Sequence, residues 1–300
     1  MVTESFPLKS GGSIPSVGLG TWQLDDEKGH DAIVYALQNG YKMIDAAYAY
    51  FNQENVAKAL KDSGIPRKDI FLVDKLANTW HTAAEECLKI TLRNLNVEYL
   101  DLWLMHWPSP LNHNGNDKKT PKLPDGSIDF EINWNYVDTW KSMINVQKKY
   151  PQKVKRIGVA NFGIKELEKL ISETGIVPEV NQVELHPALN QQKLYLYCKE
   201  KGIQLVAYSP LGSIGSPLLK NEELDSIAKS KGITLAQLIL SWGVANGWPV
   251  IPRSQSPERI LQNINLVDLT PDEVSLISNI GKKNSGRYVC SSWHVFSEDD

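Results

Sequence analysis

Short apolar runs alternate with longer amphipathic segments along nearly the whole chain. The runs have the length of buried strands, and the segments between them have the length of helices. This pattern predicts strands at 16–22, 41–46, 70–76, 100–107, 156–161, 179–185, 204–209 and 249–253.

The segments between these runs carry helix-starting signals. Ser256-Pro257 places an N-cap residue before a proline at the first helical position, and Thr82 with Glu85 matches a capping box. Before the first predicted strand, Gly11-Gly12 indicates the turn of a hairpin within 6–17. Helices are expected near 29–39, 52–64, 134–149, 222–231 and 235–246, and after 82, 161, 190, 256 and 270.

Alternation of strands and helices favours a parallel sheet with right-handed crossovers. Eight such units within 300 residues are typical of an α/β protein with a (β/α)8 TIM barrel. A doubly wound open sheet is the alternative. The chain shows no linker, internal repeat or low-complexity segment, so residues 1–300 are expected to form a single domain.

Composition narrows the class of protein. The formal net charge of −3 gives no basic excess of the kind that nucleic acid or a membrane surface attracts. The three cysteines have neither zinc-site spacing nor the even number of a disulfide framework, which indicates a reducing compartment. The N-terminus resembles no signal peptide, and no apolar run approaches membrane-spanning length. We therefore expect a cytoplasmic protein with no nucleic-acid or membrane partner.

Polar residues stand where the predicted strands end. Because the carboxyl ends of barrel strands meet at one mouth, these side chains should converge there and form a functional site. From the second strand to the eighth, they are Asp45, Lys75, His106, Asn161, Gln182, Tyr208-Ser209 and Arg253-Ser254.

Four residues in this region have complementary chemistry: Asp45, Tyr50, Lys75 and His106. An ammonium beside a phenol favours the phenolate and lowers the pKa of that phenol, while a carboxylate holds the ammonium charged. A histidine can hydrogen-bond the oxygen that the phenol protonates. The alternatives are a structural ion pair for Asp45 and Lys75, a backbone-bonded core histidine for His106, and loop packing for Tyr50.

Other known motifs are absent. Gly18 and Gly20 follow the predicted hairpin within 6–17, but Gln23 breaks the dinucleotide-binding glycine fingerprint. The chain has no P-loop and no HExxH sequence, and its remaining histidines lack ligand spacing. No metal site is expected.

Several stretches together resemble the aldo-keto reductase family, and most closely its fungal members. They span almost the whole chain: GLGTW (18–22), IDAAYAYFN (44–52), LVDKL (72–76), YLDLWLMHWP (99–108), IGVANF (157–162), VNQVELHP (180–187), AYSPLGS (207–213) and VIPRSQSPERI (250–260).

The resemblance implies a (β/α)8 barrel closed at its base by the N-terminal hairpin, with a C-terminal tail over the mouth. It also implies NADPH bound across that mouth, and a catalytic set of Tyr50, Asp45, Lys75 and His106. The implied cofactor-binding residues are Thr21, Asn161, Gln182, Tyr208, Ser209, Leu211, Ser213, Arg253, Ser254, Arg259 and Asn263. The implied substrate walls are Trp22, Trp80, Trp107 and Trp293.

The chain departs from the family pattern at several positions near this site, among them Ala46 in place of the frequent threonine and Arg253 in place of the commoner lysine. Ala160 stands where a serine is usual, so one hydrogen bond to the cofactor would be missing. Asp74 precedes Lys75 where a small polar residue is usual. Strand alternation should point Asp74 away from the mouth, with little effect on Lys75.

The resemblance thus implies NADPH-dependent reduction of small aldehydes and ketones to alcohols by a monomer, with Tyr50 as the proton donor. The alternatives are a non-catalytic NADPH-binding regulatory protein of the same fold, and an unrelated barrel hydrolase or isomerase. The intact set of four residues argues against the first, and the missing metal and phosphate motifs argue against the second.

Overall fold

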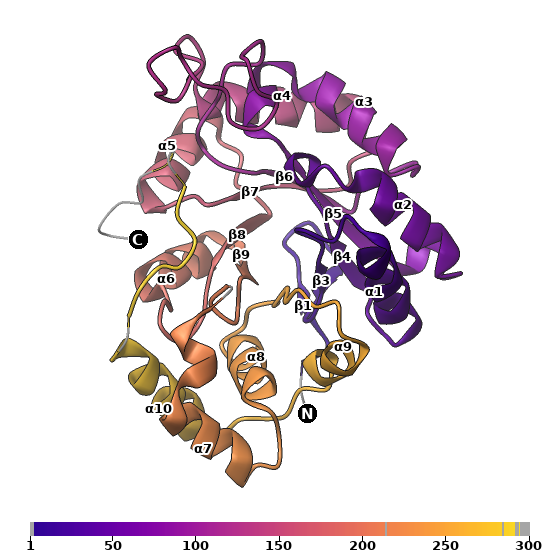
Figure 1. The fold of residues 1–300 in the computed structure, drawn as a ribbon. Coiled ribbons are helices and arrows are strands. Elements are labelled where there is room, and N and C mark those ends of the chain that lie inside the picture. The colour runs from indigo at the N-terminus through magenta and orange to yellow at the C-terminus, as the bar shows by residue number, and fades with distance from the viewer. Residues whose placement is uncertain (1–2, 214, 284, 292–293, 295–300) are drawn as a thin grey trace.

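The computed structural model describes residues 3–213, 215–283, 285–291 and 294, and its strands form one parallel sheet in chain order (Figure 1). Each strand pairs with the next along the chain, and this sequential order rules out the doubly wound alternative, whose strand order reverses. The strands are β3 Leu19–Gly20, β4 Met43–Asp45, β5 Phe71–Leu76, β6 Leu102–Met105, β7 Ile157–Ala160, β8 Val180–Glu184 and β9 Gln204–Tyr208.

The predicted eighth strand at 249–253 occupies the gap between the last strand and the first, but it does not form a continuous strand. Val250 alone makes parallel bridges, to Val17 on one side and to Ala207 on the other. Pro249 and Pro252 flank this segment and have no backbone N–H to donate to a ladder. These bridges close the sheet, and the prediction of a (β/α)8 barrel is confirmed.

Helices surround the sheet (Figure 1). Ser256 caps α9 as predicted, but the predicted capping box at Thr82 is wrong, because a 3₁₀ turn occupies Asn78–Ala83 and α3 begins after it without a side-chain cap. The α-helices are α1 Glu27–Gln38, α2 Gln53–Asp62, α3 Ala84–Asn94, α4 Tyr136–Lys149, α5 Ile164–Thr174, α6 Gln192–Lys201, α7 Glu222–Ser230, α8 Leu235–Ala245, α9 Pro257–Ile264 and α10 Pro271–Lys282. The 3₁₀ helices are η1 Tyr48–Tyr50, η2 Arg67–Asp69, η3 Asn78–Ala83 and η4 Pro217–Lys220.

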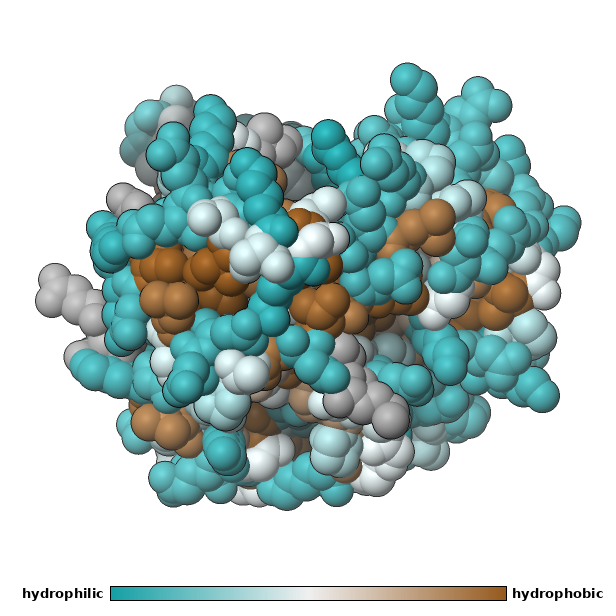
Figure 2. Space-filling view, turned by 90° about the horizontal axis from the view of Figure 1, so that it is seen from below, coloured by the Kyte–Doolittle hydropathy of each residue, from teal (hydrophilic) through white to brown (hydrophobic). Residues whose placement is uncertain are grey.

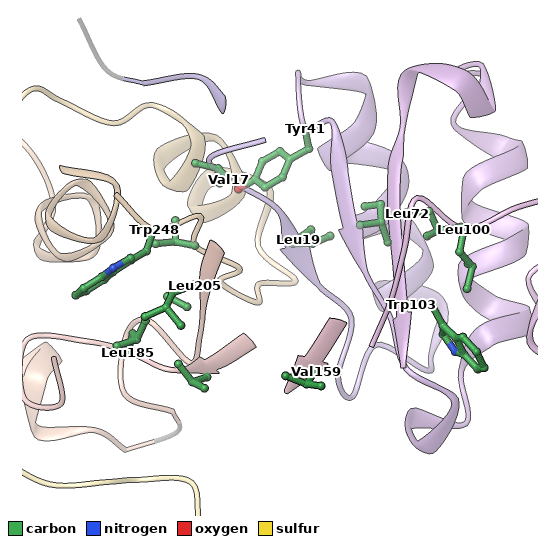
Figure 3. Close-up of a cluster of buried hydrophobic side chains, with 14 of the residues drawn as sticks. Val17, Leu19, Tyr41, Leu72, Leu100, Trp103, Val159, Leu185, Leu205 and Trp248 are labelled. Carbon is green, nitrogen blue, oxygen red and sulfur yellow. The ribbon is translucent and has the colours of Figure 1, made fainter. Parts of the chain in front are cut away.

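Alternation along the strands divides the core in two. Leu72, Trp103, Val159 and Leu205 point outward and pack under the helices (Figure 3). A second cluster fills the barrel, and its strand residues occupy the alternate positions. Its members are Leu8, Ile14, Met43, Val73, Leu102, Leu104, Ala160, Val180, Val206 and Ile251.

The N-terminal hairpin closes the amino end of the barrel. Its strands, β1 Ser5–Pro7 and β2 Ser13–Pro15, pair antiparallel, and Ile14 joins the cluster inside the barrel. The carboxyl ends of the strands are therefore the open end.

One face of the surface is drawn in Figure 2. The face shown in Figure 2 carries mainly hydrophilic side chains with separate apolar patches between them. Within the described residues, no helix combines the length and the apolar content needed to cross a membrane.

Candidate active site

Strand alternation brings Asp45, Lys75 and Gln182 into the barrel, just above the apolar cluster. Met43, Val73 and Val180 lie two residues before them and point the same way. The Lys75 Nζ atom lies 2.5 Å from Asp45 Oδ1 and donates a further hydrogen bond to the carbonyl of Ala46 at 2.9 Å. Gln182 Nε2 donates to the other carboxylate oxygen of Asp45 at 2.7 Å. The buried carboxylate is therefore paired on both sides.

Tyr50 completes the group from η1. Tyr50 is the last residue of this short 3₁₀ turn, which Phe51 terminates in the left-handed region at φ 56°. The Lys75 Nζ atom lies 5.2 Å from the centre of the Tyr50 ring. The His106 ring meets the Tyr50 ring edge-on, with centroids 5.7 Å apart. The structure thus brings the four residues of the predicted catalytic set together.

Burial changes the electrostatics expected from the sequence. It raises the pKa of the Tyr50 phenol above its usual value, and the attraction of Lys75 offsets only part of that rise. The lysine acts in the predicted direction, but the prediction of a lowered phenol pKa is wrong because burial is the larger effect. At neutral pH Tyr50 therefore keeps its proton and can donate it.

The surroundings of Lys75 and His106 determine the charge state of each side chain. Burial alone would lower the pKa of Lys75, but attraction to Asp45 and Tyr50 outweighs it and raises that pKa. Lys75 therefore stays charged. Burial, followed by repulsion from Lys75, lowers the pKa of His106 well below its usual value, so the imidazole is neutral.

His106 is not held as a bonded core histidine. Its buried Nδ1 atom has no hydrogen-bond partner within the described part of the chain. Its backbone carbonyl accepts a hydrogen bond from Asn161 Nδ2 at 2.9 Å, and Asn161 Oδ1 accepts one from the Tyr208 hydroxyl at 2.8 Å. The side-chain amides of Asn161 and Gln182 and the ring of Tyr208 thus lie beside the catalytic set, where the family resemblance implies a nicotinamide.

A second group gathers cationic and polar side chains at the start of α9. Arg253 and Arg259 are exposed, and neither has a carboxylate partner among the described residues. Ser254 is nearly buried and accepts a hydrogen bond from the backbone N–H of Ser256, the N-cap of α9. A helix start with unpaired guanidinium groups fits a phosphate.

The remaining residues that the resemblance implies for the cofactor lie after β3, in the loop after β9 and on α9. Ser209 and Ser213 have positive φ values of 45° and 66° in the loop after β9, and Leu211 between them is half-buried. Asn263 is buried on α9. Thr21 is buried and donates its hydroxyl hydrogen to the carbonyl of Asp45, so that hydroxyl serves the fold.

Three of the four predicted substrate-wall tryptophans, Trp22, Trp80 and Trp107, follow the carboxyl ends of β3, β5 and β6. Trp80 in η3 contacts the Tyr48 ring edge-on at 5.5 Å, and the Trp107 ring lies 5.6 Å from that of His294 in the tail. Trp22 follows β3 and is 42% exposed. Trp293 lies outside the described residues.

The tail is attached to the site by a residue that sequence reasoning missed. Glu184 is fully buried at the end of β8, two positions after Gln182. Its carboxylate accepts hydrogen bonds from the backbone N–H groups of Tyr288 at 2.7 Å and Val289 at 3.0 Å, and it also contacts His186 Nε2 at 2.9 Å. The sequence did contain a signal for Glu184, namely an acidic residue near the end of the predicted apolar strand 179–185, within VELHP (183–187). The tail after α10 therefore crosses the end of β8 (Figure 1).

Asp74 points away from the mouth, as predicted. It is fully buried outside the barrel, where Oδ2 accepts from Gln53 Nε2 at 2.9 Å and Oδ1 from the backbone N–H of Lys75 at 2.7 Å. Burial raises the pKa of this carboxyl to about 7, against the opposing effect of these hydrogen bonds.

This raised pKa predicts a pH-dependent stability. Between the unfolded pKa of about 3.9 and the folded pKa of about 7, the folded protein binds a proton at Asp74 that the unfolded chain does not. The stabilisation is complete below the unfolded pKa, and it decreases by about 1.4 kcal/mol per pH unit as the pH rises to the folded pKa. From pH 5.5 to 7, urea unfolding should show the wild type losing roughly 2 kcal/mol relative to Asp74→Asn. A constant difference between the two proteins would contradict the buried, protonated carboxyl.

Comparison with known proteins agrees with this geometry. The sequence profile described as "Aldo/keto reductase family" matches residues 16–282. The aldehyde reductase YPR1 of Saccharomyces cerevisiae is 41% identical over 302 residues, covering 98% of this chain and 96% of that protein. The D-galacturonate reductase of Hypocrea jecorina is 45% identical over 282 residues, covering 93% and 91%. The solved aldose reductase of Schistosoma japonicum superposes with a TM-score of 0.88 at 32% identity, over 96% of this chain and 94% of that one.

Proposed function

Because the chain belongs to the aldo/keto reductase family, we propose that it is an oxidoreductase that reduces aldehydes and ketones to alcohols with NADPH, using Tyr50 as the proton donor. The observation that carries this proposal is the position of the Lys75 ammonium, which is bonded to Asp45 and lies 5.2 Å from the Tyr50 ring, with His106 on the edge of that ring. We also propose a cytoplasmic monomer built from one domain.

When bound, the nicotinamide cofactor supplies a hydride to the carbonyl carbon. Tyr50, which is protonated at neutral pH, donates its proton to the oxygen on which negative charge develops. The Lys75 ammonium stabilises the phenolate that Tyr50 becomes, and Asp45 keeps that ammonium charged and oriented. The neutral His106 ring can hydrogen-bond the same carbonyl oxygen and orient it.

The polar residues around this centre fit a nicotinamide dinucleotide. The side-chain amides of Asn161 and Gln182 have donors and acceptors for a carboxamide, and Tyr208 offers its ring face. The loop with Ser209, Leu211 and Ser213 would follow the pyrophosphate, and Thr21 would border the cofactor. Arg253, Ser254 and Arg259 would hold a 2′-phosphate, with Asn263 near the adenine.

A non-catalytic cofactor-binding protein of the same fold is not supported. Such a protein has no need for a charged lysine paired inside the barrel beside a protonated tyrosine. The relatives at 41% and 45% identity are named as reductases, and one at 40% is named as a dehydrogenase.

The direct test follows NADPH absorbance with purified protein and a panel of aldehydes, α-keto esters and diketones. We expect carbonyl-dependent oxidation of NADPH with at least one class of substrate. Tight NADPH binding without oxidation by any of them would instead support the non-catalytic alternative.

The tail should determine which carbonyl compounds are accepted. Truncation after Val289 keeps both N–H donors to Glu184, whereas deletion of 287–300 removes them and leaves a buried carboxylate under-satisfied. We expect both variants to change the relative kcat/KM of bulky and small aldehydes by more than about tenfold, or roughly 1.4 kcal/mol. Only the longer deletion should lower Tm. A uniform loss across substrates would show a purely structural tail.

A further inference from the structure

The insertion between β6 and α4, residues 109–133, is fixed against the barrel mouth. Thr79 in η3 donates its hydroxyl hydrogen to the carbonyl of Lys118 at 2.9 Å. His113 Nδ1 bonds the carbonyl of Thr79 at 2.7 Å, and its ring packs edge-on against Trp80 with centroids 4.4 Å apart. These contacts hold the insertion beside a predicted wall of the substrate site.

A shallow cavity of about 710 Å³, wide open to solvent, lies between this insertion and η1. Phe51, which directly follows Tyr50, forms one side of it. The insertion supplies the rest of the lining: Asn116, Asp117, Lys118, Lys119, Thr120 and Lys122.

The lining is cationic. Lys118, Lys119 and Lys122 are exposed, and none forms an ion pair within the part of the chain that the structure describes. Asp117 is the acidic residue of the lining, and its Oδ1 atom accepts hydrogen bonds from the backbone N–H groups of Lys119 at 2.7 Å and Thr120 at 2.6 Å. Asp117 stays charged and also attracts Lys119 and Lys122, so one negative and three positive side chains leave the lining with a net charge of +2 in a chain whose net charge is −3.

This cationic cavity lies next to the catalytic centre, because its wall residue Phe51 directly follows Tyr50 and His113 of the insertion packs against Trp80. The charge of Lys119 is close enough to contribute to the lowered pKa of His106, after burial and Lys75. A substrate whose carbonyl lies between Tyr50 and His106 could therefore extend past Phe51 and reach the lysines.

We propose that this cavity binds an anionic group of the substrate, so that the preferred substrates are aldehydes and ketones that carry a carboxylate or phosphate remote from the reacting carbonyl. This inference rests on the proposed function and specifies its substrate class. Three unpaired ammonium groups attract an anion and gain partners when it binds. Exposed pairs contribute modestly, so we expect about a tenfold effect rather than a thousandfold one.

The test compares 4-carboxybenzaldehyde with its methyl ester, which has the same ring and aldehyde but no charge. We expect wild-type kcat/KM to favour the acid by about tenfold at low salt, and the preference to shrink at 0.5 M NaCl, a condition chosen to screen exposed charges. The triple variant Lys118→Gln/Lys119→Gln/Lys122→Gln should lose this preference and reduce the ester within about twofold of the wild type. Retained ester reduction shows that the variant is folded.

The matched control is Lys9→Gln/Lys42→Gln/Lys68→Gln. It removes the same number of charges from exposed lysines near the amino end of the barrel, before the strands begin. This control should keep the preference for the acid. A third substrate, 4-formylphenyl phosphate, shows whether the cavity prefers a phosphate or a carboxylate. The proposal is supported if the triple variant of the insertion loses more kcat/KM for either anionic substrate than for the ester.

Two results would overturn the inference, and they are distinguishable. In the first, the wild type reduces the ester with NADPH, but the triple variant Lys118→Gln/Lys119→Gln/Lys122→Gln changes kcat/KM for the acid and for the ester by the same factor. The anion site is then wrong and the proposed function stands. If the wild type reduces neither these compounds nor any other carbonyl compound tested, the proposed function fails and the inference fails with it.

Discussion

Replacing Tyr50 with phenylalanine should lower kcat for carbonyl reduction at least about 100-fold, because general acid catalysis typically contributes 10²–10⁴-fold. The phenylalanine ring keeps the packing against His106 and the position over Lys75, so the site should stay in place. Only the hydroxyl that donates the proton is lost. NADPH binding, followed by fluorescence titration, should change by less than about threefold, since no predicted contact to the cofactor involves this hydroxyl.

Tyr48→Phe is the matched control for this variant. Tyr48 begins the same 3₁₀ turn and contacts Trp80, but it lies outside the group formed by Lys75 and Asp45. It should keep most of the wild-type kcat. If purified Tyr50→Phe retains more than a tenth of wild-type turnover, the role assigned to Tyr50 is wrong.

The second large effect concerns the choice of cofactor. We expect kcat/KM with NADPH to exceed that with NADH by at least about 100-fold, because charge-assisted hydrogen bonds contribute roughly 1.5–3 kcal/mol each. Arg253 and Arg259 are exposed without carboxylate partners in the described structure, and Ser256 opens α9 between them. A 2′-phosphate would pair with both guanidinium groups and meet the start of the helix. NADH has a hydroxyl there and leaves the two cations unpaired.

Arg259→Ala should therefore raise KM for NADPH far more than KM for NADH. Arg93→Ala, which removes an exposed arginine on α3, is the control and should leave the ratio unchanged. Comparable kcat/KM for the two cofactors in the wild-type protein would contradict the phosphate site.

The strand pattern predicted most of this site because alternation is a local property. Asp45, Lys75 and Gln182 each lie two residues after an interior apolar position, so their direction followed from the sequence alone. Asp74 pointed outward by the same rule. The boundary errors also have local causes, since Pro249 and Pro252 disrupt the last strand.

What the sequence could not predict depends on contacts between distant segments. The attachment of Tyr288 and Val289 to Glu184 joins residues more than 100 positions apart, and no short motif encodes it. The cationic cavity could not be predicted either, because it forms only where the insertion lies beside Phe51. The pKa of Tyr50 depends on how deeply its phenol is buried, which the sequence does not reveal. Burial raises this pKa, whereas the charge of Lys75, which the sequence did reveal, lowers it.

The central claim, hydride transfer from the nicotinamide cofactor to a carbonyl carbon, is tested most directly by isotope labelling. The wild-type protein would reduce a good aldehyde substrate with NADPH deuterated at C4 on one face or the other, and the alcohol would be analysed by NMR. The account predicts deuterium on the alcohol carbon from one labelled face only, and none on that carbon from unlabelled NADPH in D₂O. Deuterium reaching that carbon from solvent, or no alcohol from any carbonyl compound, would contradict it.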